Sequence, residues 1–160
     1  MILTRTPFRV SFFGGGTDLP GWVDQYGGSV ISTSINKYCH ISLRSLPPFF
    51  DHKHRFVYSK VESIRSLHET EHPVIREVLL HYQISEGLEI HHDGDLPARS
   101  GLGSSSSFTV GLLAAVNAHL GIMKTKTELA KEAIFVEQTL LNEAVGLQDQ
   151  IATSFGGFNH

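Results

Sequence analysis

The segment Leu96–Phe108 constrains this chain more than any other, because it places a loop rich in glycine and serine between two regular elements. The residues before it, Leu88–His92, have the pattern of a β-strand, and the apolar residues after it recur at helical spacing. Glycines such as Gly101 and Gly103 let a backbone approach a ligand closely. The free N–H groups at a helix start carry partial positive charge and bind phosphate. The sequence therefore predicts a strand, a shaped anion-binding loop and a helix in succession.

The better-known phosphate and nucleophile motifs are absent from this loop. It lacks the Gly-x-x-x-x-Gly-Lys-Ser/Thr of a P-loop, and Gly101-x-Gly103 lacks the third glycine of a dinucleotide-binding fingerprint. No serine stands in the Gly-x-Ser-x-Gly pattern of an α/β-hydrolase. A flexible loop whose first serine merely caps a helix is the simpler alternative. The apolar helix directly behind the loop favours the shaped anion site.

The remaining patterns predict a single α+β domain over residues 1–160. Alternating side chains indicate strands at 8–13 and around 41–43, with a shorter strand near 55–58. Helices are expected from Pro73 and behind the glycine/serine loop. A third helix, opened by the capping box at Thr125 and Glu128, is expected from Thr127 to about Ala144, with Gly146 as its terminator. Strands come first and helices later, which suits α+β better than a regular parallel α/β repeat.

Composition excludes several classes of protein and partner. Of the 160 residues, 41% are hydrophobic, which excludes a disordered chain. A formal charge of −3 spread along the chain does not indicate a basic surface that would bind nucleic acid or an anionic membrane. The longest apolar run, near residues 108–116, is too short to span a bilayer. Residues 1–7 show no signal segment, and a single cysteine, Cys39, favours a reducing compartment. We therefore expect a cytoplasmic protein.

Two acidic residues are candidates for chemistry. Glu137 falls on the third expected helix, and Asp149 follows Gly146. A phosphoryl-transfer site needs a carboxylate for Mg²⁺ and often another for the acceptor hydroxyl. From the residues alone, Glu137 is more simply a solvated helix residue, and Asp149 is equally well explained as a cap or turn residue.

The ten histidines also raise the question of a metal site. The close groupings are His52-x-His54 and His91-His92-Asp93, and neither has the paired spacing of a structural zinc site. We therefore interpret these histidines as surface or loop residues.

Several motifs together resemble the GHMP kinases, the superfamily of galactokinase, homoserine kinase and mevalonate kinase. The run Pro97–Ser105 resembles their Pro-x-x-x-Gly-Leu-Gly/Ser-Ser-Ser motif, and Pro7–Asp18 is similar to their first motif. Residues 12–18, 32–38, 72–77 and 101–112 resemble recurrent motifs of the sugar-1-kinase branch that includes heptose 7-phosphate kinase. The resemblance implies the α+β GHMP N-terminal domain, which is similar to domain 2 of ribosomal protein S5. The ferredoxin-like C-terminal half of these kinases is not expected within these 160 residues.

The resemblance implies ATP and Mg²⁺ as cofactors. Phosphate-binding positions would be Gly101, Leu102, Gly103, Ser104, Ser105 and Ser106, with Arg99 as a further phosphate contact. Ser105 and Glu137 would hold Mg²⁺.

The resemblance also implies a catalytic pair and an acceptor site. Asp149 would act on the acceptor hydroxyl as base or orienting group, and Arg9 would stabilise the transferring phosphoryl group, although an arginine on a strand is usually exposed. Asp18 matches the aspartate that holds sugar hydroxyls, although an aspartate in such glycine-rich sequence is commonly a turn residue. The acceptor would be bound by Gly14, Gly15, Gly16, Thr17 and Asp18. Galactokinase has Glu-His where this chain has Gly15-Gly16, which disfavours galactose and leaves room for a bulkier or phosphorylated sugar.

The function implied is a sugar kinase that phosphorylates the anomeric hydroxyl of D-glycero-D-manno-heptose 7-phosphate, for nucleotide-activated heptose synthesis. A fucokinase-, galactokinase- or arabinokinase-like activity, and an inactive nucleotide-binding fragment, are the alternatives. The final residues, 155–160, resemble part of a family strand, so we expect apolar faces at this end that favour self-association.

Overall fold

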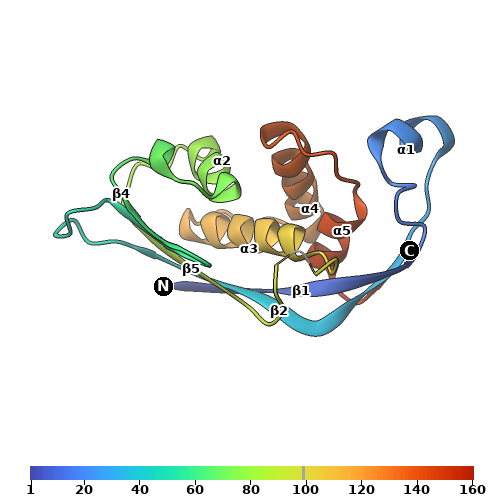
Figure 1. The fold of residues 1–160 in the computed structure, drawn as a ribbon, viewed down its shortest axis with the longest axis horizontal. Helices are drawn as coiled ribbons and strands as arrows, with labels where there is room; N and C mark the ends of the chain where they lie inside the picture. The colour runs from blue at the N-terminus through green and yellow to red at the C-terminus, as the bar shows by residue number, and fades with distance from the viewer. Residues whose placement is uncertain (99) are drawn as a thin grey trace.

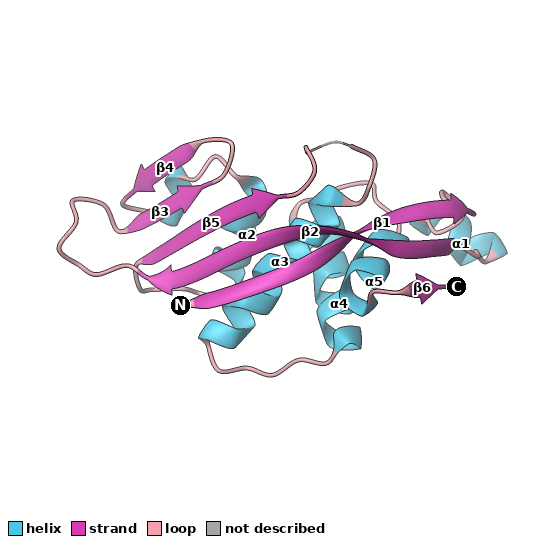
Figure 2. Ribbon diagram, turned by 90° about the horizontal axis from the view of Figure 1, so that it is seen from below, coloured by secondary structure: helices cyan, strands magenta, loops and turns pink. Residues whose placement is uncertain are grey.

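The computed structural model describes residues 1–98 and 100–160 and shows one sheet with helices packed on one face (Figure 1). The sheet has six strands in the order β1-β2-β5-β3-β4, with β6 also paired to β2. All pairings are antiparallel except that of β3 with β5 (Figure 2). The strands are β1 Ile2–Phe13, β2 Ile31–Ser45, β3 His54–Val57, β4 Val61–Ile64, β5 Leu88–Gly94 and β6 Phe158–Asn159.

Four of the α-helices, α2 to α5, lie on the same side of the sheet, and α1 stands at one end of it (Figure 1). A single 3-10 turn, η1, precedes α2, and a π-helical turn, η2, follows α4 directly. The helices are α1 Pro20–Tyr26, η1 Leu67–Glu69, α2 Pro73–His81, α3 Ser104–His119, α4 Lys126–Phe135, η2 Val136–Leu140 and α5 Gln148–Phe155.

The core forms between the sheet and α3. Cys39, Ile41 and Leu43 of β2 alternate toward the helices and are fully buried, as period-2 patterning requires. The threonines of β1 fasten α3 to the sheet, because Thr4 Oγ1 donates to Gly111 O at 3.0 Å and Thr6 Oγ1 donates to Ser107 O at 2.8 Å. The helix that follows the glycine/serine loop is therefore held rigidly against β1.

Most of the expected elements are confirmed. Pro73 opens α2, and Thr125 and Glu128 make the reciprocal capping box that opens α4. The chain does end on a short strand, β6, that pairs with β2. The strand β4 was not expected, and it pairs with β3 to form an edge hairpin.

The expected helix to Ala144 is wrong, because α4 and η2 together end at Leu140. Asn142 adopts a positive φ of 53°, in the left-handed region that asparagine tolerates and that stops a helix. Gly146 is consequently not a helix terminator; it lies in the connection before α5. The helix α5 was not expected, and Asp149 lies in its first turn.

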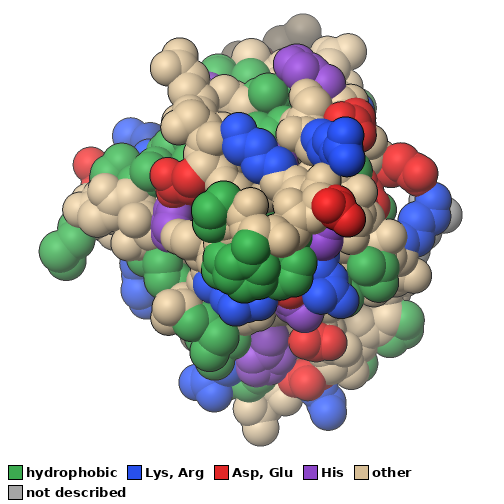
Figure 3. Space-filling view, turned by 90° about the vertical axis from the view of Figure 1, so that its left-hand side faces the viewer, with side chains coloured by type: hydrophobic (Ala, Val, Ile, Leu, Met, Phe, Trp, Pro, Cys, Tyr) green, Lys and Arg blue, Asp and Glu red, His purple; other side chains and the backbone are tan. Residues whose placement is uncertain are grey.

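The surface seen from the left of Figure 1 carries Lys/Arg and Asp/Glu side chains that are interspersed (Figure 3). Within the sheet, the buried carboxylate of Glu89 on β5 pairs with Arg44, Arg55 and His91. Among the described residues, no helix combines the length and the apolar character that crossing a membrane requires.

Candidate active site

An ion pair between β1 and α5 forms the centre of the candidate site. Arg9 Nε donates to Asp149 Oδ1 and Arg9 Nη2 donates to Asp149 Oδ2, both at 2.7 Å. This parallel pairing matches a guanidinium to both oxygens of one carboxylate, which is among the strongest and most directional contacts in proteins. Arg9 is 9% exposed, so the alternative of an exposed strand arginine is wrong. The structure brings the two predicted catalytic residues together.

Arg9 also joins this pair to the glycine/serine loop. Its Nη1 donates to Gly101 O at 2.9 Å, and its backbone N–H donates to Leu102 O at 3.0 Å. Gly103 is the N-cap of α3 with φ 74°, and a Cβ there would lie 3.0 Å from Arg9 Cγ. Glycine is therefore required at Gly103 both for its backbone conformation and for the close approach of the arginine.

The start of α3 has the features of an anion site. Among the residues that the structure describes, no side chain caps this helix end, so its first N–H groups are not used by a capping residue. Ser104 and Ser105 open the helix, the first half-buried and the second exposed, whereas Ser106 is buried. A helix start with free N–H groups and two accessible hydroxyls is suited to phosphate oxygens.

Glu137 is 1% exposed, and it lies in the π-helical turn η2. Its Oε2 accepts hydrogen bonds from Ser106 Oγ at 2.9 Å and from Gln150 Nε2, whereas its Oε1 has no partner among the described residues. Burial raises the pKa of Glu137, although the side chains of Thr109, Gln150 and Ser106 act in the opposite direction. The interpretation of Glu137 as a solvated helix residue is wrong, and a buried carboxylate with a free oxygen fits a cation.

A cavity of about 220 Å³ connects these groups. Its walls include the phosphate-loop serines, the buried carboxylate and the ion-paired aspartate, together with two residues of the first motif. The relevant lining residues are Ser105, Ser106, Glu137, Asp149, Gly16 and Asp18. One cavity is therefore lined by residues that lie far apart in the sequence. They were predicted separately as metal-binding, catalytic and substrate-binding residues.

Asp18 has a structural role that sequence reasoning did not find. Its Oδ2 accepts from the backbone N–H groups of Leu147 and Gln148 at 2.8 and 2.9 Å, and its Oδ1 accepts from Gly16 N at 3.1 Å. A carboxylate offers about four acceptor positions, so these three bonds leave capacity for one more. Gly146 must be glycine here, because a Cβ on it would lie 2.0 Å from Asp18 Oδ2. The expected role of Asp18 toward a sugar stays a prediction.

The glycines of the first motif form a turn that packs against the start of β2. Gly14 has φ 86°, and Ser29 O occupies the position that a Cβ on Gly14 would take. Thr17 Oγ1 donates to Gly14 O at 2.7 Å and closes the turn. Gly15 lies beside the amide of Gln148, and a Cβ on Gly16 would meet nothing within 4 Å. The space predicted at Gly16 is therefore present.

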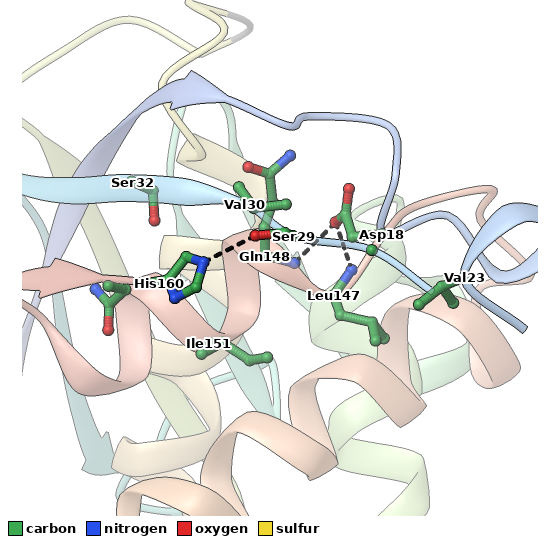
Figure 4. A pocket seen from close by; sticks show the side chains of 11 residues that line it. Asp18, Val23, Ser29, Val30, Ser32, Leu147, Gln148, Ile151 and His160 are labelled. Atoms are coloured by element: carbon green, nitrogen blue, oxygen red, sulfur yellow. Dashed lines mark hydrogen bonds between the residues drawn. The ribbon is translucent and has the colours of Figure 1, made fainter. Parts of the chain in front are cut away.

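A second cavity of about 390 Å³ lies beyond this turn, between α1, β2 and α5 (Figure 4). Asp18 and Gln148 line it on the side of the ion pair, and Ser29 bonds to His160 at 2.8 Å across it. Its remaining wall is largely apolar, formed by Val23, Val30, Leu147 and Ile151.

A third cavity of about 390 Å³ adjoins Ser104 and Ser105 of α3 and is lined by aromatic rings. The ring centroids of His72 and His92 lie 4.7 and 4.9 Å from that of Phe108. Ser104 and Ser105 also line this cavity. Burial, followed by the influence of His92, lowers the pKa of His72 to about 4, so the ring is neutral near pH 7. Flat, uncharged rings beside a phosphate site are suited to a nucleotide base.

The profile described as GHMP kinases N terminal domain matches residues 67–157, more than half of the chain. The chain belongs to the GHMP kinase family. Its fold, an α+β sheet with the helices on one face, is the one that the motif resemblance implied. The family assignment from sequence is thus confirmed.

Two curated relatives and one solved structure illustrate where this GHMP kinase domain lies within the family. D-glycero-alpha-D-manno-heptose 7-phosphate kinase from Campylobacter jejuni is 32% identical over 99% of this chain and 49% of that protein. L-fucokinase/L-fucose-1-P guanylyltransferase from Bacteroides fragilis is 28% identical over 91% of this chain and 18% of that protein. The crystal structure of a D-glycero-D-manno-heptose 1-phosphate kinase from Bacteroides thetaiotaomicron has a TM-score of 0.86 at 27% identity, covering 99% of this chain and 55% of its own. The chain thus spans about half the length of the heptose kinases it matches.

Two sequence-based assignments in this GHMP kinase domain concern Arg99 and His54. Arg99, predicted to contact phosphate, lies outside the described residues. His54, interpreted as a surface or loop residue, is 1% exposed on β3, and its Nδ1 accepts from Leu88 N at 3.3 Å. That interpretation is wrong, because the alternation of β3 turns His54 toward the core.

Among the described residues, no group of three histidine, cysteine or acidic side chains could hold a metal ion.

Two features were not expected from the sequence: the cluster of the His72, His92 and Phe108 rings, and the partners of Glu137. The pattern of β5 contained a signal for His92, since Leu88, Ile90 and His92 share one face of a strand. Gln150 and Ser106 bond Glu137 from two other elements, and no spacing in the sequence indicates that contact.

Proposed function

We propose that this protein is an ATP-dependent sugar kinase whose acceptor is the anomeric hydroxyl of D-glycero-D-manno-heptose 7-phosphate. The observation that carries the proposal is the Arg9–Asp149 pair held against the glycine/serine loop, because it sets a carboxylate beside a helix start suited to phosphate. The similarity to heptose kinases from two organisms supports this choice of acceptor.

The nucleotide would occupy the helix start and the adjoining ring cavity. The backbone of Gly101, Leu102 and Gly103 and the hydroxyls of Ser104 and Ser105 would bind its phosphates. The base would enter the cavity lined by His72, His92 and Phe108. Ser105 lines both this cavity and the one that contains Glu137, so the base and the phosphates would lie in adjoining cavities.

A divalent cation fits the buried carboxylate. Glu137 Oε1 is buried without a hydrogen-bond partner among the described residues, and Ser105 lines the same cavity. A carboxylate oxygen and a serine hydroxyl are hard oxygen ligands of the kind that Mg²⁺ takes. Mg²⁺ bound there would neutralise charge on the nucleotide phosphates.

Asp149 would act on the acceptor. It accepts the proton of the anomeric hydroxyl as that oxygen bonds to the γ-phosphorus of ATP, and the bond between this phosphorus and the bridging oxygen breaks to release ADP. Arg9 holds both oxygens of Asp149 and keeps N–H groups beyond the three that it uses. Those groups face developing charge on the transferred group. The sugar itself would lie at Gly14–Asp18, which borders the cavity beyond Asp18.

The acceptor is tested with a panel of sugars and sugar phosphates, using protein expressed from its complete reading frame. ADP release is measured with ATP and Mg²⁺ and with each candidate acceptor in turn. We expect D-glycero-D-manno-heptose 7-phosphate to have the highest kcat/KM. If only non-phosphorylated hexoses such as fucose or galactose react, the heptose phosphate assignment is wrong.

A further inference from the structure

The two oxygens of Glu137 have different surroundings. Ser106 Oγ and Gln150 Nε2 both donate to Oε2, and Oε1 receives no hydrogen bond from the described residues. Both donors are buried, Ser106 at 3% and Gln150 at 0% exposure. The carboxylate is therefore fixed in orientation by two side chains that solvent does not reach.

Gln150 is placed for this contact by α5. It follows Asp149 directly, and successive helix residues point about 100° apart. Asp149 faces Arg9, and Gln150 faces Glu137. The amide oxygen of Gln150 has no hydrogen-bond partner among the described residues, so the amide interacts with its surroundings through its nitrogen. The first turn of α5 thus carries both the carboxylate expected to act on the acceptor and the side chain that orients the buried one.

We propose that Gln150, together with Ser106, is a positioning residue that makes Glu137 a one-oxygen ligand and thereby favours Mg²⁺ over Ca²⁺. With Oε2 occupied by two donors, Oε1 is the oxygen left for a cation, and Glu137 lines the cavity of about 220 Å³. Mg²⁺ requires a compact octahedral arrangement of single oxygens, whereas Ca²⁺ readily takes both oxygens of one carboxylate. Orienting partners of this kind govern metal affinity through the ligand they hold. The inference rests on the proposed kinase function, because it concerns the cation which that reaction uses.

The test measures cation binding without turnover. Mn²⁺ is titrated into the protein with bound ADP, and its binding is followed by the relaxation of water protons. Mg²⁺ and Ca²⁺ are then compared as competitors. For the wild-type protein we expect Mg²⁺ to displace Mn²⁺ at lower concentration than Ca²⁺ does.

The decisive variant is Gln150→Met, which keeps the length of the side chain and removes the donor. We expect its dissociation constant for Mn²⁺ to rise about 10-fold or more, and its preference for Mg²⁺ over Ca²⁺ to fall toward one. Ser106→Ala removes the other donor and should shift both quantities in the same direction. Ser154→Ala is the matched control, because the Ser154 hydroxyl on α5 has no hydrogen-bond partner among the described residues. Thermal melting shows whether each variant is folded. If Gln150→Met does not fold, the cation affinities of Ser106→Ala decide whether the positioning role holds.

Two results would overturn the inference, and they can be told apart. If Gln150→Met and Ser106→Ala keep wild-type Mn²⁺ affinity and wild-type Mg²⁺ preference while Glu137→Gln abolishes binding, the positioning role alone is wrong. If the wild-type protein with ADP gives no relaxation enhancement at all, the proposed kinase site fails together with it.

Discussion

Arg9 illustrates how much one side chain contributes to this site. Its three guanidinium nitrogens each donate one hydrogen bond, two to Asp149 and one to Gly101 O. A lysine has the same charge but carries it on one nitrogen, so it cannot match both carboxylate oxygens and the carbonyl with this geometry. The arginine therefore sets the orientation of Asp149 as well as the local charge.

Replacing Arg9 with lysine tests this role. We expect Arg9→Lys to lower kcat by about 10²-fold, because Asp149 loses one of its two bonds and with it a fixed orientation. Arg5→Lys is the matched control on the same strand, where Arg5 stacks on Tyr38 at 4.4 Å, away from the site. Steady-state kinetics of both variants decide the question, and wild-type kcat for Arg9→Lys would contradict the assignment.

At the scale of elements, the contact between α3 and β1 depends on a helical glycine. A Cβ on Gly111 would lie 2.7 Å from Thr6 Oγ1 and 3.3 Å from Ile41 Cδ1. In an ordinary exposed helix, alanine is more favourable than glycine by about 1 kcal/mol. Overpacking a tight contact costs about 1–3 kcal/mol, which reverses that preference here.

We therefore expect Gly111→Ala to lower the free energy of unfolding by about 1 to 2 kcal/mol, measured by urea denaturation. Gly21→Ala on α1 is the control, because a Cβ there would meet nothing within 4 Å. It should leave stability unchanged or slightly raised. A Gly111→Ala protein as stable as the wild type would show that α3 does not need this close approach.

The same elements show what the sequence could and could not predict. The start of α2 at Pro73 and the start of α4 at Thr125 depend on neighbours within three residues, so their local patterns identify them. The start of α5 depends on Asp18, which lies 129 residues from Leu147. No local pattern can show that contact, so the sequence predicts neither α5 nor the position of Asp149 in its first turn. The motifs identified Glu137 as a ligand candidate, but its burial and its partners come only from tertiary packing.

At the scale of the whole molecule, buried histidines link stability to pH. Burial, followed by the charge of Lys53, lowers the pKa of His54 from 6.5 to about 4. As pH falls below 6.5, the unfolded chain binds a proton at this residue before the folded protein does, so stability decreases until pH reaches about 4. Each pKa unit corresponds to about 1.4 kcal/mol, which gives a loss of about 3 kcal/mol over this window from His54.

We expect the melting temperature to fall between pH 6.5 and 4, and to fall less steeply in His54→Gln, which removes the titrating ring. His68→Gln, at an exposed position, should follow the wild-type curve. Thermal melts at half-unit pH intervals provide the comparison. Parallel curves for His54→Gln and the wild-type protein would contradict the role given to this histidine.

Transfer of phosphate to the anomeric hydroxyl can be observed by ³¹P NMR of a reaction containing the protein, ATP, Mg²⁺ and D-glycero-D-manno-heptose 7-phosphate. The arrangement of Arg9, Asp149 and the start of α3 predicts a new anomeric phosphate resonance that grows in step with ADP. It also predicts that Asp149→Asn binds the nucleotide normally but slows this transfer by about 10²-fold or more. Wild-type turnover in Asp149→Asn, or no transfer to the anomeric hydroxyl of any sugar by the wild-type protein, would contradict the account.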